Sequence, residues 1–163
     1  MQEFLFRMLD DETYGAAGYS GDEAAVTVPE IYNGRPVTML LDDLFKGHKE
    51  IEQVAIPDTV TDIGGFVFDG CENLRHVQLP AGLRYMWQYA FARCGIEEVV
   101  IPEKVKDIVP FTFKGCRNLK KIVCGPGLKE ISAWAFAGCD AVKEFIHEPE
   151  TKVSEQAFLD NNG

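Results

Sequence analysis

The sequence predicts one mainly β domain built as a solenoid, in which short repeats stack and share a core. Phenylalanines recur every 22 or 23 residues through most of the chain, and the same apolar positions return around each of them in the same order. A period of this length indicates repeats that cannot bury their apolar side alone. The 163 residues, 46% of them apolar, suffice for one well-buried core and favour a single domain.

The repeat is defined by columns of equivalent residues. The six reference phenylalanines are Phe45, Phe68, Phe91, Phe113, Phe136 and Phe158. Apolar residues stand eight and five positions before most of them, and a second apolar group begins three positions after them. A residue missing between Cys94 and Ile96 accounts for one of the two 22-residue steps. These columns predict the core.

The two ends of the chain differ from the repeats. In residues 1–34, Phe4, Phe6 and Met8 alternate with their neighbours, and a further short strand is expected around Val26. We expect this segment to be a β-rich cap, because the end of a solenoid exposes apolar layers that need covering. The repeats then occupy residues 35–146. Residues 147–163 are interpreted as a degenerate C-terminal turn, because apolar positions there become polar.

Each repeat is expected to contain two short strands and a helical turn. The pattern Leu-x-x-Val-x-Leu-Pro alternates as a strand does, and the proline ends it because it has no N–H for a ladder. The Val-x-x-Ile pair that follows predicts a second strand. The pattern Ala-Phe-x-Gly-Cys suits a tight helical turn closed by glycine.

The combined pattern Ala-Phe-x-Gly-Cys-x-x-Leu-x-x-Val-x-Ile-Pro-x-x-Val-x-x-Ile resembles the BspA-like leucine-rich repeats of bacteria, also called the Treponema pallidum type. Residues 19–29 and 33–38 are similar to the usual entry into such arrays, and the resemblance covers about residues 14–158. It implies a right-handed leucine-rich-repeat solenoid that serves as an interaction surface. Better-known members of this family are exported adhesins.

The outward positions of the first strand are the candidate binding residues, because a solenoid presents them together on one concave sheet. Three apolar residues fall side by side there with charged neighbours, as in a partner surface. Ordinary β propensity at solvated strand positions is the alternative explanation. The candidates are His76, Gln78, Glu98, Val100, Lys121, Val123, Glu144 and Ile146.

Two further columns have a simpler structural explanation. Cysteines at spacings of 22 and 23 residues do not form the paired motifs of zinc sites, so we expect buried free thiols donating to loop carbonyls, although adjacent rungs are close enough for a disulfide. A column of aromatic residues two positions before the phenylalanines predicts stacking between turns, with carbohydrate binding as the alternative. These rings are Phe66, Tyr89, Phe111 and Trp134.

Charge limits the partners. A net charge of −10 argues against a general nucleic-acid binder or an anionic-membrane anchor, since either needs clustered cations. The start of the chain resembles neither a signal peptide nor a membrane span, so we expect a cytoplasmic protein, or a surface or secreted one if an export segment precedes it. Lysines and arginines gather between Lys104 and Lys129, opposite in sign to the acidic cap, which favours weak self-association through the ends.

No catalytic pattern accompanies the repeats. The three histidines lie at different repeat phases, and no glycine-rich phosphate loop occurs. We therefore expect no enzyme, no metal and no cofactor. The function that the sequence favours is a protein-interaction module that binds a protein or peptide. The alternative is a structural or self-assembling element, or a fragment of a cell-surface adhesin array.

Overall fold

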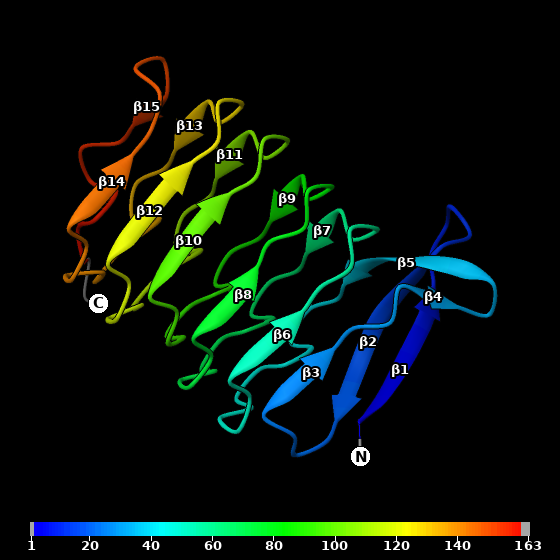
Figure 1. The fold of residues 1–163 in the computed structure, drawn as a ribbon. Coiled ribbons are helices and arrows are strands. Elements are labelled where there is room, and N and C mark those ends of the chain that lie inside the picture. Colours follow the sequence, from blue (N-terminus) through cyan, green and yellow to red (C-terminus); the bar gives the residue numbers. More distant parts are fainter. Residues whose placement is uncertain (1, 161–163) are drawn as a thin grey trace.

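The computed structural model describes residues 2–160, which form stacked turns of short strands with no helix among them (Figure 1). One side, here called the front face, holds one strand from each turn, and the opposite side, the back face, holds the second. The front-face strands are β3 (Ala25–Thr27), β6 (Gln53–Ala55), β8 (His76–Gln78), β10 (Glu98–Ile101), β12 (Lys121–Cys124) and β14 (Glu144–Ile146). The back-face strands are β5 (Arg35–Leu40), β7 (Asp62–Ile63), β9 (Tyr85–Met86), β11 (Asp107–Ile108), β13 (Glu130–Ile131) and β15 (Lys152–Val153).

The N-terminal end is covered by an antiparallel pair, β1 (Glu3–Met8) and β2 (Tyr14–Ser20), and β2 continues the back-face ladder by pairing in parallel with β5. The rings of Phe4 and Tyr19 pack on Phe45 with centroids 6.1 and 5.1 Å away. This covers the first layer of the core, as expected for the cap. Within the range that the sequence assigned to the cap, β3 is already the first strand of the front face, because it pairs in register with β6.

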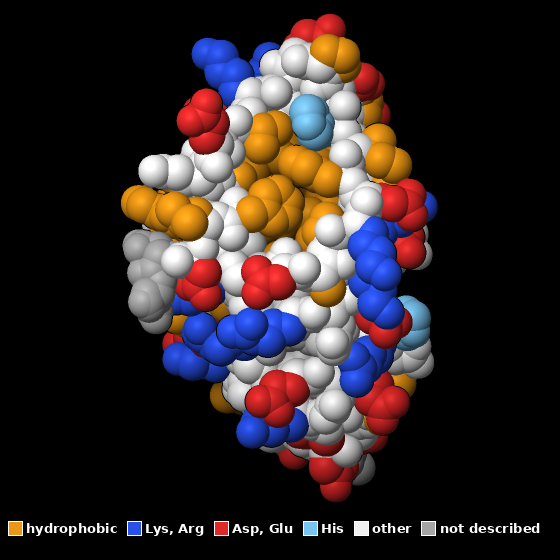
Figure 2. Space-filling view, turned by 90° about the vertical axis from the view of Figure 1, so that its left-hand side faces the viewer, with side chains coloured by type: hydrophobic (Ala, Val, Ile, Leu, Met, Phe, Trp, Pro, Cys, Tyr) orange, Lys and Arg blue, Asp and Glu red, His pale blue; other side chains and the backbone are white. Residues whose placement is uncertain are grey.

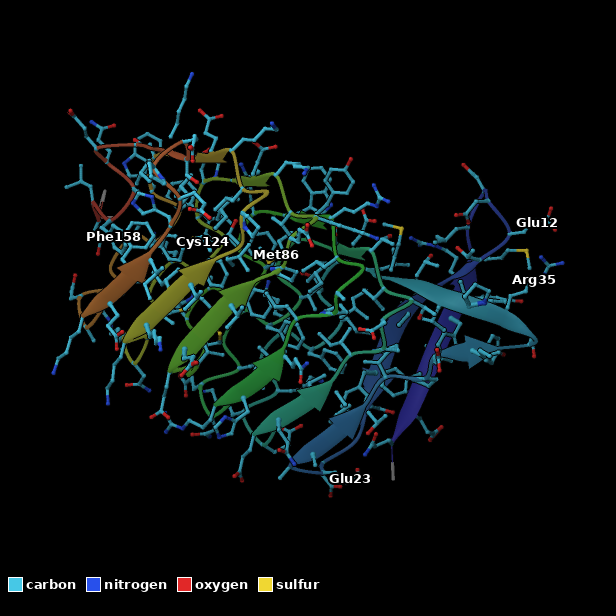
Figure 3. The ribbon with its side chains drawn as sticks, turned by 45° about the horizontal axis from the view of Figure 1, so that its top comes forward. Glu12, Glu23, Arg35, Met86, Cys124 and Phe158 are labelled. Carbon is cyan, nitrogen blue, oxygen red and sulfur yellow. The ribbon has the colours of Figure 1, made fainter. Side chains whose placement is uncertain are left out.

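A hairpin links the cap to the first repeat. Strand β4 (Ile31–Tyr32) pairs antiparallel with β5 through a two-residue turn in which Asn33 and Gly34 both have positive φ, 50° and 74°. Asparagine followed by glycine favours this turn because both tolerate the left-handed region. Nearby, Arg35 lies 3.3 Å from the carboxylate of Glu12, and both side chains stand at the outer edge of the cap (Figure 3).

The six phenylalanines stack along the axis and form the centre of the core. Their ring centroids are 4.9 to 5.3 Å apart with interplanar angles between 8° and 21°. All except Phe158 are completely buried. The apolar columns before and after them are also buried, with Met86 and Cys124 as examples inside the turns (Figure 3). The repeat period therefore predicted the core correctly.

The expected helical turn is wrong. The Ala-Phe-x-Gly-Cys segments form turns without a helix, and the backbone N–H of Phe68 donates to the carbonyl of Ala90 in the next repeat at 2.7 Å. The aromatic residue two positions earlier lies in the left-handed region in every copy, with φ of 60° at Phe66 and 67° at Phe111. A helix cannot run through such a residue. The segments bond between repeats instead.

Both strand ladders are interrupted at the same junction. The front face divides into a β3-β6-β8 sheet and a β10-β12-β14 sheet, and on the back face the ladder ends at β9 and resumes at β11. The turn segments still bridge the junction, since Phe91 N–H donates to Thr112 O at 2.8 Å and the Phe91 and Phe113 rings stack at 5.3 Å. At this junction the turn segments therefore stay hydrogen-bonded, whereas the front-face and back-face ladders are interrupted.

The C-terminal end is more open than the N-terminal end. Figure 2, which looks onto that end, shows a recessed apolar area within a polar rim. The core side chains of the last turn, Phe145 and Phe158 among them, are only half-buried, and Leu159 is exposed. The last turn still stacks on the repeat before it, because Thr151 Oγ1 donates to Leu128 O at 2.9 Å.

Candidate partner-binding face

Six of the eight predicted binding residues form two straight rows across one sheet. Strands β10, β12 and β14 are parallel and in register, so that Glu98 pairs with Lys121 and Lys121 with Glu144. The second row is Val100, Val123 and Ile146. The two-residue alternation within each strand predicted that these side chains share one face, because alternate residues of a strand point the same way.

The apolar row is open to solvent. Val100 and Ile146 are 55% and 48% exposed, and Val123 between them is half-buried. The charged row borders it on one side, with Lys121 Nζ 4.0 Å from the carboxylate of Glu144. An apolar row beside charged residues can bury aliphatic side chains of a partner and orient it by charge.

His76 and Gln78 lie on β8 and are exposed, but they do not extend these rows. The ladder interruption separates β8 from β10. Between the two strands lies a groove of about 1160 Å³ whose lining includes residues of both. The predicted site is therefore divided into the two rows on β10, β12 and β14 and the β8 wall of the groove.

Sequence reasoning missed the groove. It is lined by Asp58, Arg75, His76, Val77, Gln78, Leu79, Ala81, Gly82, Glu97, Glu98, Val100, Pro102, Glu103 and Lys104. A signal was present, since the shortened spacing between Cys94 and Ile96 falls just before β10. The shortened spacing indicated an irregular repeat, but only the structure shows that both strand ladders are interrupted there.

The cysteine column forms buried, free thiols. Cys71 Sγ donates to Phe45 O at 3.1 Å, Cys116 Sγ to Phe91 O at 3.0 Å, and Cys139 Sγ to Phe113 O at 3.1 Å. Burial raises the pKa of the Cys71 thiol to about 12 and that of Cys124 to about 11. Cys71, Cys116 and Cys139 thus donate to loop carbonyls as the cysteine column predicted, whereas Cys124 is a buried thiol outside that column.

The aromatic column stacks from turn to turn. Phe66, Tyr89, Phe111 and Trp134 follow one another with centroids 4.7, 5.3 and 5.7 Å apart and planes within 10°. Lys46 Nζ lies 4.9 Å from the centroid of the first ring, a cation–π contact at the end of the row. The ring faces pack against one another, which agrees with the stacking interpretation of this column.

Within residues 2–160, no group of three or more His, Cys, Asp or Glu is placed to hold a metal ion. Over the same part of the chain, no helix has the length and apolar character needed to cross a membrane.

Comparison with known families gives one match over most of the chain. The model of the BspA type leucine rich repeat region matches residues 38–163 in six copies. A comparison with curated proteins finds no match.

Several solved structures share the fold. A leucine-rich repeat protein of T. pallidum is 27% identical with a TM-score of 0.75, and the match covers 92% of this chain and 82% of that one. A leucine rich cell surface protein of Faecalibacterium prausnitzii is 22% identical, with a TM-score of 0.63 over 87% of this chain and 52% of its own. The pneumococcal vaccine antigen PcpA is 16% identical, with a TM-score of 0.64 over 94% and 48%. This chain thus spans about half the length of the last two.

Proposed function

Because this chain belongs to the BspA-type leucine-rich repeat family, and is a protein-interaction or structural repeat module, we propose that it binds a protein or peptide partner on its front face. The partner contacts the sheet of β10, β12 and β14. The observation that carries the proposal is the exposed row of Val100, Val123 and Ile146.

The physical support is the combination of register and exposure. Neighbouring parallel strands lie about 4.8 Å apart, so three adjacent apolar side chains make a continuous strip about 10 Å long. Burying such a strip contributes about 25 cal/mol for each Å² of apolar surface removed from water. Glu98, Lys121 and Glu144 border the strip on the same three strands, so the strip has a charged edge.

A photo-crosslinking experiment tests this function. A benzoylphenylalanine replaces Val123 in one variant and Glu130 in a control, where position 130 is exposed on the back face. In a lysate of the source organism, the front-face variant is expected to give a discrete protein adduct that excess unlabelled wild type suppresses. Val123→Glu combined with Ile146→Glu should abolish competition by the unlabelled protein. Equal adducts from positions 123 and 130 would contradict the proposal.

A second candidate function is structural, as an element that stacks end to end or belongs to a cell-surface array. Its support is the half-buried apolar layer at the C-terminal end (Figure 2), together with the description of one solved relative as a cell surface protein. The exposed Leu159 lies at that end, and Leu5, also exposed, lies on the cap.

Sedimentation velocity tests the structural alternative. End stacking through the apolar layer should give concentration-dependent association that Leu159→Glu removes, while Leu5→Glu serves as the matched control. A protein that stays monomeric up to high concentration at both low and high salt would exclude this function.

A further inference from the structure

The groove between β8 and β10 lies at the junction where one repeat is a residue shorter, between Cys94 and Ile96. Gly95, in the shortened segment, donates its N–H to Cys71 O at 3.2 Å. A Cβ at this position would come 2.2 Å from Glu72 O, so no other residue fits without a backbone shift. The shortened segment thus runs directly against the preceding repeat before β10 begins.

The front-face ladder is lost at this point. In the intact repeats, the N–H of Lys120 donates to Glu97 O and that of Lys143 to Lys120 O, both at 2.8 Å. Over residues 2–160, no backbone hydrogen bond joins β8 to β10. The side chain of Arg75 bridges part of the junction instead, with Nη1 3.4 Å from Gly95 O.

The floor of the groove is apolar because the opening reaches core positions. Val77 is half-buried, whereas its equivalents Val54, Val99 and Ile122 are at most 4% exposed. Val77 and Leu79 line the groove, and the exposed Val100 stands on its far wall. An apolar side chain entering here would be surrounded by aliphatic groups on three sides.

The rim of the groove is acidic. Four exposed carboxylates line it, those of Asp58, Glu97, Glu98 and Glu103, against two cations, Arg75 and Lys104. In the described part of the chain, none of these six residues takes part in an ion pair. The guanidinium of Arg75 is directed at a carbonyl, and Asp58 Oδ1 accepts from the N–H of Ala81 at 3.2 Å, so the three glutamates are the rim carboxylates available to cations of a partner.

The groove also continues along the solenoid. A second hollow of about 560 Å³ over β3 and β6 shares Asp58, His76 and Gln78 with it. A hollow that crosses several strands in line suits an extended segment better than a compact small molecule. At about 3.3 Å per extended residue, four neighbouring strands accommodate roughly five residues.

We propose that this groove takes an extended peptide segment of the partner in which one aliphatic or aromatic side chain is flanked by lysine or arginine. This inference rests on the proposed function and specifies the chemistry of the partner. The apolar side chain contacts Val77, Leu79 and Val100, and the flanking cations pair with the glutamates of the rim. The net charge of −10 adds long-range attraction for such a segment.

The test is an NMR titration of the ¹⁵N-labelled protein with the peptide acetyl-Gly-Lys-Lys-Leu-Lys-Lys-Gly-amide at low salt. Shifts are expected at residues 75–79 and 97–100. Two matched peptides, with serine for leucine and with glutamate for lysine, should each bind at least about tenfold more weakly. Equal binding of all three peptides, or no shifts at the groove, would overturn the inference.

Two protein variants localise the binding. Glu97→Lys with Glu103→Lys should weaken binding of the lysine peptide about tenfold or more, and Glu130→Lys on the back face should leave it unchanged. Replacing Gly95 by Glu-Asn restores the longer spacing found between Cys71 and Leu74 and should close the groove. A variant closed in this way that binds the peptide like wild type would also overturn the inference.

The result is separable from the test of the proposed function. Shifts confined to Val123 and Ile146 would refute the groove while leaving partner binding on the front face intact. Groove binding without a crosslinked adduct at position 123 would refute the apolar strip as the contact and leave the groove inference standing.

Discussion

The guanidinium of Arg93 bridges two repeats by holding the carboxylate of Asp69, with Nη2 2.8 Å from Oδ1 and 3.0 Å from Oδ2. The Asp69 side chain is 8% exposed, and that of Arg93 is 49% exposed. Asp69 and Arg93 follow Phe68 and Phe91 in the turn segments. These segments keep their hydrogen bonds between repeats across the junction where both strand ladders are interrupted.

Removing the arginine of this pair should destabilise the protein. Arg93→Ala leaves a buried carboxylate without its cation, and because the arginine is half exposed we expect a loss of about 1–2 kcal/mol in the free energy of unfolding. Urea denaturation measures it. The control is Arg117→Ala, whose partner Asp140 is 3.8 Å away with both side chains exposed, and which should cost less than about 0.5 kcal/mol. Equal losses would show that burial does not strengthen the first pair.

Two left-handed residues at equivalent repeat positions, the aromatic Phe111 and the acidic Asp43, should respond oppositely to glycine. Phe111→Gly relieves an unfavourable φ of 67° but removes stacking on Tyr89 and Trp134, so we expect a loss of about 1–3 kcal/mol. Asp43 occupies the same position in the first repeat, also with φ of 67°, and is exposed with no ring to stack. Asp43→Gly should therefore stabilise by about 0.5 kcal/mol. Denaturation midpoints of the two variants give the signs directly, and the same sign for both would contradict the argument.

The buried thiols should make the protein less stable in alkali. Burial raises the folded-state pKa of the Cys124 thiol to about 11 from its ordinary value of 9.0, so the unfolded chain loses its thiol proton first. The stability from this thiol is complete below pH 9 and is lost as pH rises from 9 toward 11, by up to about 1.4 kcal/mol per pH unit. Between pH 9 and 11, Cys124→Val should reduce the slope of the unfolding free energy against pH by the contribution of one proton, up to about 1.4 kcal/mol per pH unit. Identical slopes for wild type and variant would exclude the effect.

Backbone exchange should reveal the interrupted ladder. The amides of Lys120 and Lys143 donate to the preceding repeat, whereas the equivalent Glu97 has no backbone acceptor in the described residues. Hydrogen exchange followed by NMR should therefore be faster at Glu97 than at its two equivalents. Protection at Glu97 equal to that at Lys120 would mean that the ladder is continuous in solution.

The sequence predicted the repeat, the core columns and the rows of the front face because each depends on period alone. Phe91, Val99 and Ile101 are buried since the same apolar pattern recurs at a fixed phase. The prediction of a helical turn was wrong because glycine in Ala-Phe-x-Gly-Cys suits the end of a helical turn locally, while left-handed aromatic residues and hydrogen bonds between repeats decide the conformation.

The groove could not be predicted from the sequence, because the missing residue lies in the loop between Cys94 and Ile96 while the lost pairing lies between strands β8 and β10. The missing residue beside Gly95 is visible in the sequence, yet loops often absorb such differences. The other short spacing, before Val153, leaves β13 and β15 paired. The sequence shows the same one-residue difference at both places, and only the packing of the repeats distinguishes the junction that loses its ladders from the one that keeps them.

The loss of two ladders at one junction also has a consequence for cooperativity. A repeat array behaves as a row of units coupled to their nearest neighbours, and the weakest coupling decides where the row divides. Here that coupling lies between β9 and β10, so the segments before and after it are expected to unfold as two cooperative blocks, the first carrying the cap and the second carrying the apolar strip.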